Sequence, residues 1–268
     1  MAASPAFPDA PGEQTRKRRP LLAYVQAFRR LSRRRARSAY PGAMTILDHL
    51  EELRLRVLKA GIALAVATSF SFIYSEQLVD FLTAPVGGRA GLASIEVTEN
   101  ISIFMRVALL AGFVLGLPFV AHQVVAYITP GLTPRERIWL YTLIPAVLLF
   151  FLSGAAFAWS VMIPVALPFL INFLGIPTHP RPLNYINFVT SLLFWIGVSF
   201  EMPLVFFFLA KLKWVTAGQL LRGWRYAVMG IATLAALITP TVDPVNMGIV
   251  TLPLLALYLI SILLARLA

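Results

Sequence analysis

The chain has 268 residues, of which 59% are apolar and only 13% charged, with a mean hydropathy of +0.78 and a net charge of +11. A soluble domain carries about 25% charged residues, so this composition excludes an ordinary soluble protein. The lack of cysteine excludes disulfides, zinc–thiolate sites and a cysteine nucleophile. Because His49, His122 and His179 lack the spacing of metal ligands, no metal or other cofactor is expected.

Residues 1–43 are rich in Arg, Pro and Ala. The pair Arg18-Arg19 invites comparison with a twin-arginine signal peptide, but the apolar stretch behind it is short and new arginines follow from Arg29. The segment is therefore predicted to be a basic, disordered cytoplasmic extension at the N-terminus, followed by a membrane domain over residues 44–268. Met44 offers an alternative start of the chain.

Six apolar stretches are candidates for membrane-spanning helices, each of which needs about 20 residues to cross a core of about 30 Å. They are Val57–Tyr74, Val107–Ile128, a third from Trp139 to the helix breakers Pro164 and Pro168, Tyr185–Ala210, Tyr226–Ile238 and Met247–Ala265. The fifth would cover only about 20 Å. A tight turn with Pro240, Asp243 and Pro244 makes the fifth and sixth an antiparallel pair.

The distribution of basic residues predicts the orientation of these spans. Most Lys and Arg precede the first span, follow the sixth, or lie in the connections after the second and fourth, whereas the opposite side has only Arg89, Arg106 and Arg181. The positive-inside rule then places both termini in the cytoplasm. The expected fold class is an all-α polytopic membrane protein with six transmembrane helices, of which the fifth and sixth are short.

Glu201 lies within the uncharged run Tyr185–Ala210, with Pro203 two positions later. A carboxylate at such depth costs about 2.5–3.5 kcal/mol on insertion scales, so it is expected to face a cavity, another helix or a partner.

Two other glutamates stand at predicted helix starts. Glu52 and Arg56 have the i,i+4 spacing of a surface ion pair in an amphipathic helix that leads into the first span. Glu136 closes a predicted capping box with Thr133, and Gly131 is expected to end the preceding helix in a left-handed conformation. Alternatively, the two carboxylates share the cytoplasmic face and bind a cationic, partly apolar peptide, because arginine forms bidentate bonds with carboxylates.

Four segments occur in order, at the spacing of six spans: His49-Leu-Glu-Glu-Leu-Arg-Leu-Arg56, Tyr127-Ile-Thr-Pro-Gly-Leu-Thr-Pro-Arg-Glu136, Gly197-Val-Ser-Phe-Glu-Met-Pro203 and Leu237-Ile-Thr-Pro240. Through them the chain resembles TatC, the polytopic subunit of the twin-arginine protein translocase, from about Thr45 to Ala265. It departs from many family members in having Leu259 rather than an acidic residue, and from some in having Met247 rather than Gln.

The resemblance implies a non-enzymatic receptor in the bacterial cytoplasmic membrane. It would bind signal peptides with paired arginines and export folded proteins using the proton-motive force, as a homo-oligomer with the single-span partners TatA and TatB. It further implies the following residue roles: Glu52 and Glu136 hold the arginines; Arg54, Arg56, Tyr127 and Leu132 shape that site; Glu201 faces a concave polar cavity of the helical bundle; Thr239 meets the partners; and Pro85 lies in the extracytoplasmic loop.

Two rival functions are open to a chain with an intramembrane carboxylate. A proton-coupled secondary transporter of a small solute would usually show repeats between its halves, and the sequence shows none. An intramembrane protease would need a Ser–His pair, two aspartates or His-Glu-x-x-His inside spans, which are also missing. No nucleic-acid partner is expected, since the basic residues flank apolar runs.

Overall fold

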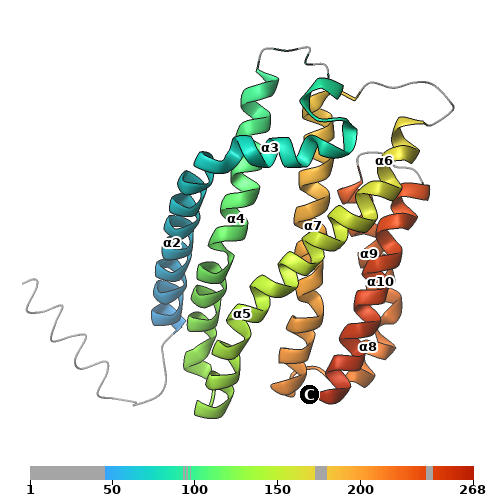
Figure 1. The fold of residues 1–268 in the computed structure, drawn as a ribbon. Coiled ribbons are helices and arrows are strands. Elements are labelled where there is room, and N and C mark those ends of the chain that lie inside the picture. Colours follow the sequence, from blue (N-terminus) through green and yellow to red (C-terminus); the bar gives the residue numbers. More distant parts are fainter. Residues whose placement is uncertain (1–45, 93, 95, 97, 173–179, 240–243) are drawn as a thin grey trace, which may run out of the picture. The chain divides into compact units, whose positions relative to one another are not determined.

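The structure is a computed structural model that describes residues 46–92, 94, 96, 98–172, 180–239 and 244–268. Within these ranges every regular element is helical (Figure 1). The chain divides into two units, Met1–Leu50 and Glu51–Ala268, and the helices below belong to the second apart from the first turn of α2. The predicted N-terminal extension, His179 and the turn residues Pro240 and Asp243 lie outside the described residues.

The first span is one continuous helix, α2 (Ile46–Ser71), so the amphipathic start leads into it without a break. A 3-10 turn (Phe72–Tyr74) then leads into α3 (Ser75–Thr83), which crosses α4 (Glu99–Ile128) and reaches α7 (Pro182–Lys211) (Figure 1). The hydroxyl of Tyr185 on α7 donates a hydrogen bond to the carbonyl of Leu82 at 2.8 Å, which ties α3 to the bundle.

The second and third spans form a hairpin of α4 (Glu99–Ile128) and α5 (Pro134–Phe157), joined by a 3-10 turn at Thr129–Gly131. The expected end of the third span at Pro164 or Pro168 was wrong. A π-helical turn (Ala158–Met162) follows α5, and α6 (Ile163–Ile171) continues the helix. The π turn places Pro164 in the first turn of α6, where a missing backbone N–H leaves no hydrogen bond unmade.

The remaining helices are α7 (Pro182–Lys211), α8 (Ala217–Arg222), α9 (Trp224–Ile238) and α10 (Pro244–Leu267). Five helical stretches of the described chain are long and apolar enough to cross a membrane, and α9 is a shorter apolar helix, which confirms the predicted arrangement. With 24 residues, α10 extends beyond the expected sixth span at both ends, so α9 is the short one.

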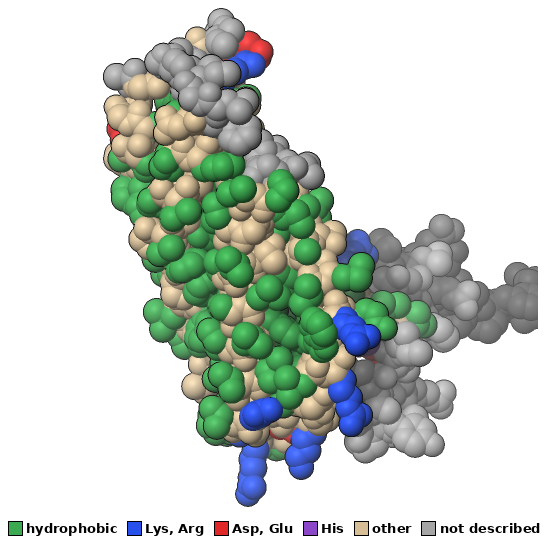
Figure 2. Space-filling view, turned by 90° about the vertical axis from the view of Figure 1, so that its right-hand side faces the viewer, with side chains coloured by type: hydrophobic (Ala, Val, Ile, Leu, Met, Phe, Trp, Pro, Cys, Tyr) green, Lys and Arg blue, Asp and Glu red, His purple; other side chains and the backbone are tan. Residues whose placement is uncertain are grey.

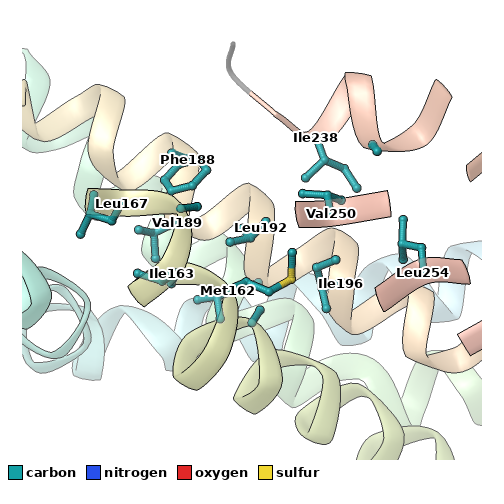
Figure 3. Close-up of a cluster of buried hydrophobic side chains, with 14 of the residues drawn as sticks. Met162, Ile163, Leu167, Phe188, Val189, Leu192, Ile196, Ile238, Val250 and Leu254 are labelled. Atoms are coloured by element: carbon teal, nitrogen blue, oxygen red, sulfur yellow. The ribbon is translucent and has the colours of Figure 1, made fainter. Parts of the chain in front are cut away.

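The centre of the core lies where α7 meets the π turn, α6, α9 and α10 (Figure 3). Met162, Ile196 and Leu254 are fully buried there. The outer face over the last helices is instead apolar, with Lys and Arg gathered towards the end where the chain terminates (Figure 2). An apolar exterior around an apolar core is the pattern of a helix bundle surrounded by lipid, because lipid tails accept apolar side chains as readily as the core does.

Candidate functional site

The first candidate region lies at the start of α2. Glu52 Oε1 accepts a hydrogen bond from Arg56 Nη2 at 3.2 Å, as the i,i+4 spacing predicted. Arg56 Nη1 also donates to Gln123 Oε1 on α4, at 3.4 Å. The side chains of Glu52 and Arg56 are only 21% and 27% exposed. The ion pair is therefore part of a link between α2 and α4, in a partly dry position where charge interactions are stronger than in water.

The second region is the start of α5, where the predicted capping box is confirmed. The backbone N–H of Thr133 donates to Glu136 Oε2 at 2.8 Å, and Thr133 caps the first turn in return. The prediction of a left-handed conformation at Gly131 was wrong, since Gly131 is not among the described residues with positive φ. A 3-10 turn ends α4 instead, with Leu132 N–H bonded to the Thr129 carbonyl at 3.1 Å.

Gln123 and Glu136 lie on either side of the α4–α5 turn, and Gln123 bonds Arg56, so both glutamates are at the same end of the bundle (Figure 1). Among the described residues, Glu52 Oε1 accepts from Arg56 and Glu136 Oε2 accepts from the Thr133 backbone, and the Thr133 side chain also hydrogen-bonds Glu136. A carboxylate has about four acceptor positions. Each can therefore accept a further N–H donor without losing its structural bond.

The other residues predicted for this site lie around the same end. Arg54 is exposed on α2, while Tyr127 and Leu132 are partly buried at the α4–α5 turn. Sequence reasoning missed two further contacts near these residues. The Gln123 amide lies 3.4 Å from His122 Nδ1, and the His122 ring lies 5.9 Å from the ring of Tyr141. The available signal was an amide in the last turns of an apolar span.

Glu201 lies on α7, which runs through Pro203 without interruption. Its Oε1 atom is buried and finds no hydrogen-bond partner among the described residues. The carboxyl group faces the backbone of Phe151 on α5. An unsatisfied oxygen at such a depth is costly, which favours a donor that arrives from outside the chain.

Thr239 follows α9 and is buried, with its hydroxyl donating to the Ala235 carbonyl at 3.0 Å. Sequence reasoning also missed Asn246, a buried polar residue in the first turns of α10. Of the two departures from the family pattern, Met247 is partly buried and Leu259 is exposed.

Pro85 lies in an exposed 3-10 turn (Ala84–Val86) after α3, at the end of the bundle opposite the α4–α5 turn (Figure 1). Nearby, Arg89 Nε contacts Asp80 at 2.5 Å and Arg89 Nη1 contacts Glu76 at 3.3 Å. These ion pairs brace the turn against α3. They are exposed, so each is worth little by itself.

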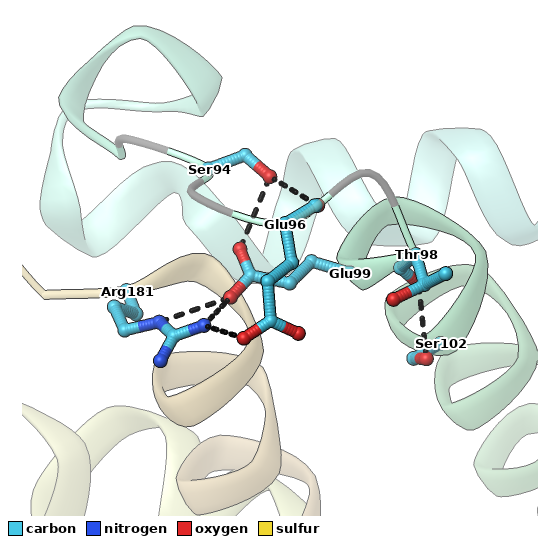
Figure 4. A network of polar contacts seen from close by, with 6 residues as sticks. All are labelled: Ser94, Glu96, Thr98, Glu99, Ser102 and Arg181. Atoms are coloured by element: carbon cyan, nitrogen blue, oxygen red, sulfur yellow. Dashed lines mark hydrogen bonds and ion pairs between the residues drawn. The ribbon is translucent and has the colours of Figure 1, made fainter.

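At the same end, Arg181 joins the starts of α4 and α7 (Figure 4). Its guanidinium donates to Glu96 and to Glu99, a residue only 1% exposed, and Ser94 Oγ donates to Glu99 Oε2 at 3.0 Å. The hydrogen bonds to Glu99 and Glu96 raise the pKa of Arg181 above its usual value. The charge pattern had placed Arg181 on this side but had not paired it with a carboxylate.

In the ranges that the structure describes, no three His, Asp or Glu side chains are grouped closely enough to hold a metal ion. The arrangement instead offers two separate features. One is a pair of glutamates at the α4–α5 end, and the other is the Glu201 carboxyl group, with a buried oxygen, in the second half of α7.

The profile of the family described as Sec-independent protein translocase protein (TatC) matches residues 48–253. The chain is 38% identical over 230 residues to the Sec-independent protein translocase protein TatC of Deinococcus radiodurans, covering 82% of this chain and 85% of that protein. It is 33% identical over 231 residues to TatC of Koribacter versatilis, with 82% and 84% covered. A crystal structure titled as the twin arginine translocase receptor TatC matches with a TM-score of 0.72 at 30% identity, covering 82% of this chain and 98% of that one.

Proposed function

Because this chain belongs to the TatC family of Sec-independent protein translocase proteins, we propose that it is the receptor for signal peptides with paired arginines. Glu52 and Glu136 bind one arginine each. The observation that carries the proposal is that two glutamates far apart in sequence lie at one end of the bundle, each with acceptor positions left over after its hydrogen bonds to described residues.

The surroundings of the two glutamates fit a peptide that is both cationic and apolar. The Glu52 side chain, only 21% exposed, lies beside exposed Leu53 and Leu55 on α2, and Ile138 and Trp139 are exposed near Glu136 on α5. An incoming guanidinium displaces Arg56 from Glu52 or shares the carboxylate with it. Arg56 keeps Gln123 as a partner in either case, so the exchange leaves no charge without a hydrogen bond. Arg54, Tyr127 and Leu132 form the rim of this site.

The proposal places the α4–α5 end on the cytoplasmic side of a bacterial inner membrane, with both termini in the cytoplasm. Its support is the charge distribution, since Arg135, Arg137, Lys211 and Lys213 lie at that end. Pro85 and the Arg181 network then face the opposite side. The basic residues 1–43 add positive charge next to the anionic inner leaflet.

Glu201 and Thr239 form the proposed contact with single-span partners of the TatA and TatB type. The unsatisfied Oε1 of Glu201 supports this role, because a polar side chain of a partner helix would supply the missing hydrogen bond. Movement of folded proteins then uses the proton-motive force, in a complex with several copies of the chain.

The test is photocrosslinking of a twin-arginine signal peptide to the full chain in membrane vesicles. We expect Glu52→Ala and Glu136→Ala each to weaken crosslinking by at least about tenfold, the effect of losing a charge-assisted hydrogen bond. Glu136→Gln separates the two roles of this residue, because the amide oxygen still caps Thr133 but carries no charge. Glu51→Ala, on the same helix turn as Glu52, is the control. Unchanged crosslinking in both alanine variants would contradict the assignment.

A further inference from the structure

Arg106 carries a positive charge inside the apolar part of α4. It lies two helical turns beyond the helix start at Glu99, about 10 Å along the axis. Its neighbours on α4, Met105 and Leu109, are exposed apolar side chains. Arg106 therefore stands on a surface that faces lipid rather than water.

Two hydroxyl groups of α7 hold the guanidinium in place. Arg106 Nε donates to Thr190 Oγ1 at 3.0 Å, and Nη2 donates to Ser191 Oγ at 2.9 Å. The Thr190 hydroxyl in turn donates to the Ile186 carbonyl at 2.6 Å, which leaves its lone pairs directed to Arg106. The hydroxyls are neutral, so they orient the charge without balancing it.

The other two arginines at this end of the bundle each form ion pairs with carboxylates. Arg89 contacts Glu76 and Asp80, and Arg181 contacts Glu96 and Glu99. For Arg106, by contrast, no carboxylate of a described residue lies within ion-pair distance. A cation at this depth without a counter-charge is costly, so it calls for an anion from outside the chain.

The depth of Arg106 matches the phosphate layer of a bilayer. The 30 residues of α4 span about 45 Å, about 15 Å more than the hydrocarbon core. If each end projects equally, the backbone of Arg106 lies only a few ångströms inside the core boundary. A long arginine side chain reaches across that distance by snorkelling.

We propose that Arg106, oriented by Thr190 and Ser191, binds the phosphate group of a phospholipid in the leaflet at the α4 N-terminal end. A guanidinium has five N–H donors, of which two are used on the hydroxyls, so a fork remains for phosphate oxygens. The acyl chains lie along Met105 and Leu109. The inference requires only that the helices span a membrane, and it does not depend on signal-peptide binding.

The experiment is a titration of the detergent-purified full chain with phosphatidylglycerol, followed by native mass spectrometry. We expect Arg106→Gln to weaken the tightest lipid site by about 10- to 100-fold. Ser191→Ala should weaken it less, because the charge stays while one orienting bond is lost. The matched control is Arg89→Gln, which removes an arginine at the same end that already has carboxylate partners and should leave lipid affinity unchanged.

Two competitors identify the ligand chemistry. Diacylglycerol with the same acyl chains should not occupy the site, and inorganic phosphate at millimolar concentration should not displace the lipid. Equal binding of diacylglycerol, displacement by inorganic phosphate, or equal affinity of wild type and Arg106→Gln would each overturn the proposal. The proposal would also be overturned if the Arg106→Gln protein retained the lipid but no longer co-purified with a single-span partner. If Arg106→Gln does not fold, an unchanged affinity of Ser191→Ala overturns it.

Discussion

The ring of Phe151 on α5 lies against Gly197 on α7, so close that a Cβ atom on the glycine would come within 2.6 Å of the ring. Three residues later in each helix the two residue types exchange places: a Cβ on Gly154 of α5 would come within 2.7 Å of the Phe200 side chain on α7. Two reciprocal glycine–phenylalanine contacts thus set the register of α5 against α7. Glu201 follows Phe200 directly, so this packing also sets the position of its carboxyl group.

The first prediction concerns this contact. Gly197→Ala should lower the free energy of unfolding by about 1–3 kcal/mol, because the added methyl overpacks the helix interface. Thermal unfolding in detergent measures the loss. Gly230→Ala is the control, since a Cβ there meets no atom within 4 Å and alanine favours the helix. Equal stability of the two variants would show that the α5–α7 contact is loose.

The second prediction concerns Glu201. Glu201→Gln should keep most transport, because the amide preserves the shape and hydrogen-bonding capacity of a protonated carboxyl group. Glu201→Ala should reduce crosslinking to single-span partners by at least about tenfold, while signal-peptide crosslinking stays near normal.

The control for Glu201 is Ser153→Ala on α5, whose exposed hydroxyl bonds only within its own helix, to the Phe150 carbonyl. Transport by Glu201→Ala at the wild-type level would show that the carboxyl group is merely tolerated. If Gln is as inactive as Ala, an ionised or proton-exchanging carboxylate becomes the better explanation.

The third prediction concerns the Arg181 network. Arg181→Gln leaves Glu99 buried without its cationic partner, so the thermal midpoint should fall by at least about 5 °C. Glu96→Gln removes an exposed partner of the same arginine and should change the midpoint little. Similar midpoints for both variants would argue against a structural role for the buried pair.

The network also predicts a pH response. A raised pKa of Arg181 means that its contribution to stability is complete below the usual arginine pKa and is lost only as pH rises through the raised value. Between pH 7 and 10, the thermal midpoint should therefore change with pH in the same way in the wild type and in Arg181→Gln.

The fourth prediction concerns orientation. With no native cysteine, single reporters can be introduced at Ala84, in the exposed turn before Pro85, and at Gly218 in α8. A membrane-impermeant thiol reagent added to intact cells should label Ala84→Cys only. Labelling of Gly218→Cys but not Ala84→Cys would reverse the proposed orientation.

The sequence by itself determined the class of the protein and the arrangement of its spans. Apolar runs of about 20 residues with charged connections predict membrane helices, because a helix satisfies its own backbone hydrogen bonds within the lipid core. The same local reasoning predicted the Glu52–Arg56 pair and the capping box of Glu136, since both lie within one or two helical turns.

Local rules failed where the outcome depended on how neighbouring turns combine. The third span passes Pro164 through a π turn, and α4 ends in a 3-10 turn rather than at a left-handed Gly131. Both ends depend on small differences between competing backbone hydrogen bonds, which residue preferences do not resolve.

Only the tertiary structure decided which residues meet across helices. Arg56 with Gln123, Arg106 with Thr190, and Phe151 with Gly197 are each far apart in the chain. Their contacts depend on the rotation and depth of one helix against another, which apolar periodicity leaves undetermined when every face of a helix is apolar. Close packing at glycines and hydrogen bonds between buried polar groups select one rotation among many, and the candidate sites are products of that selection.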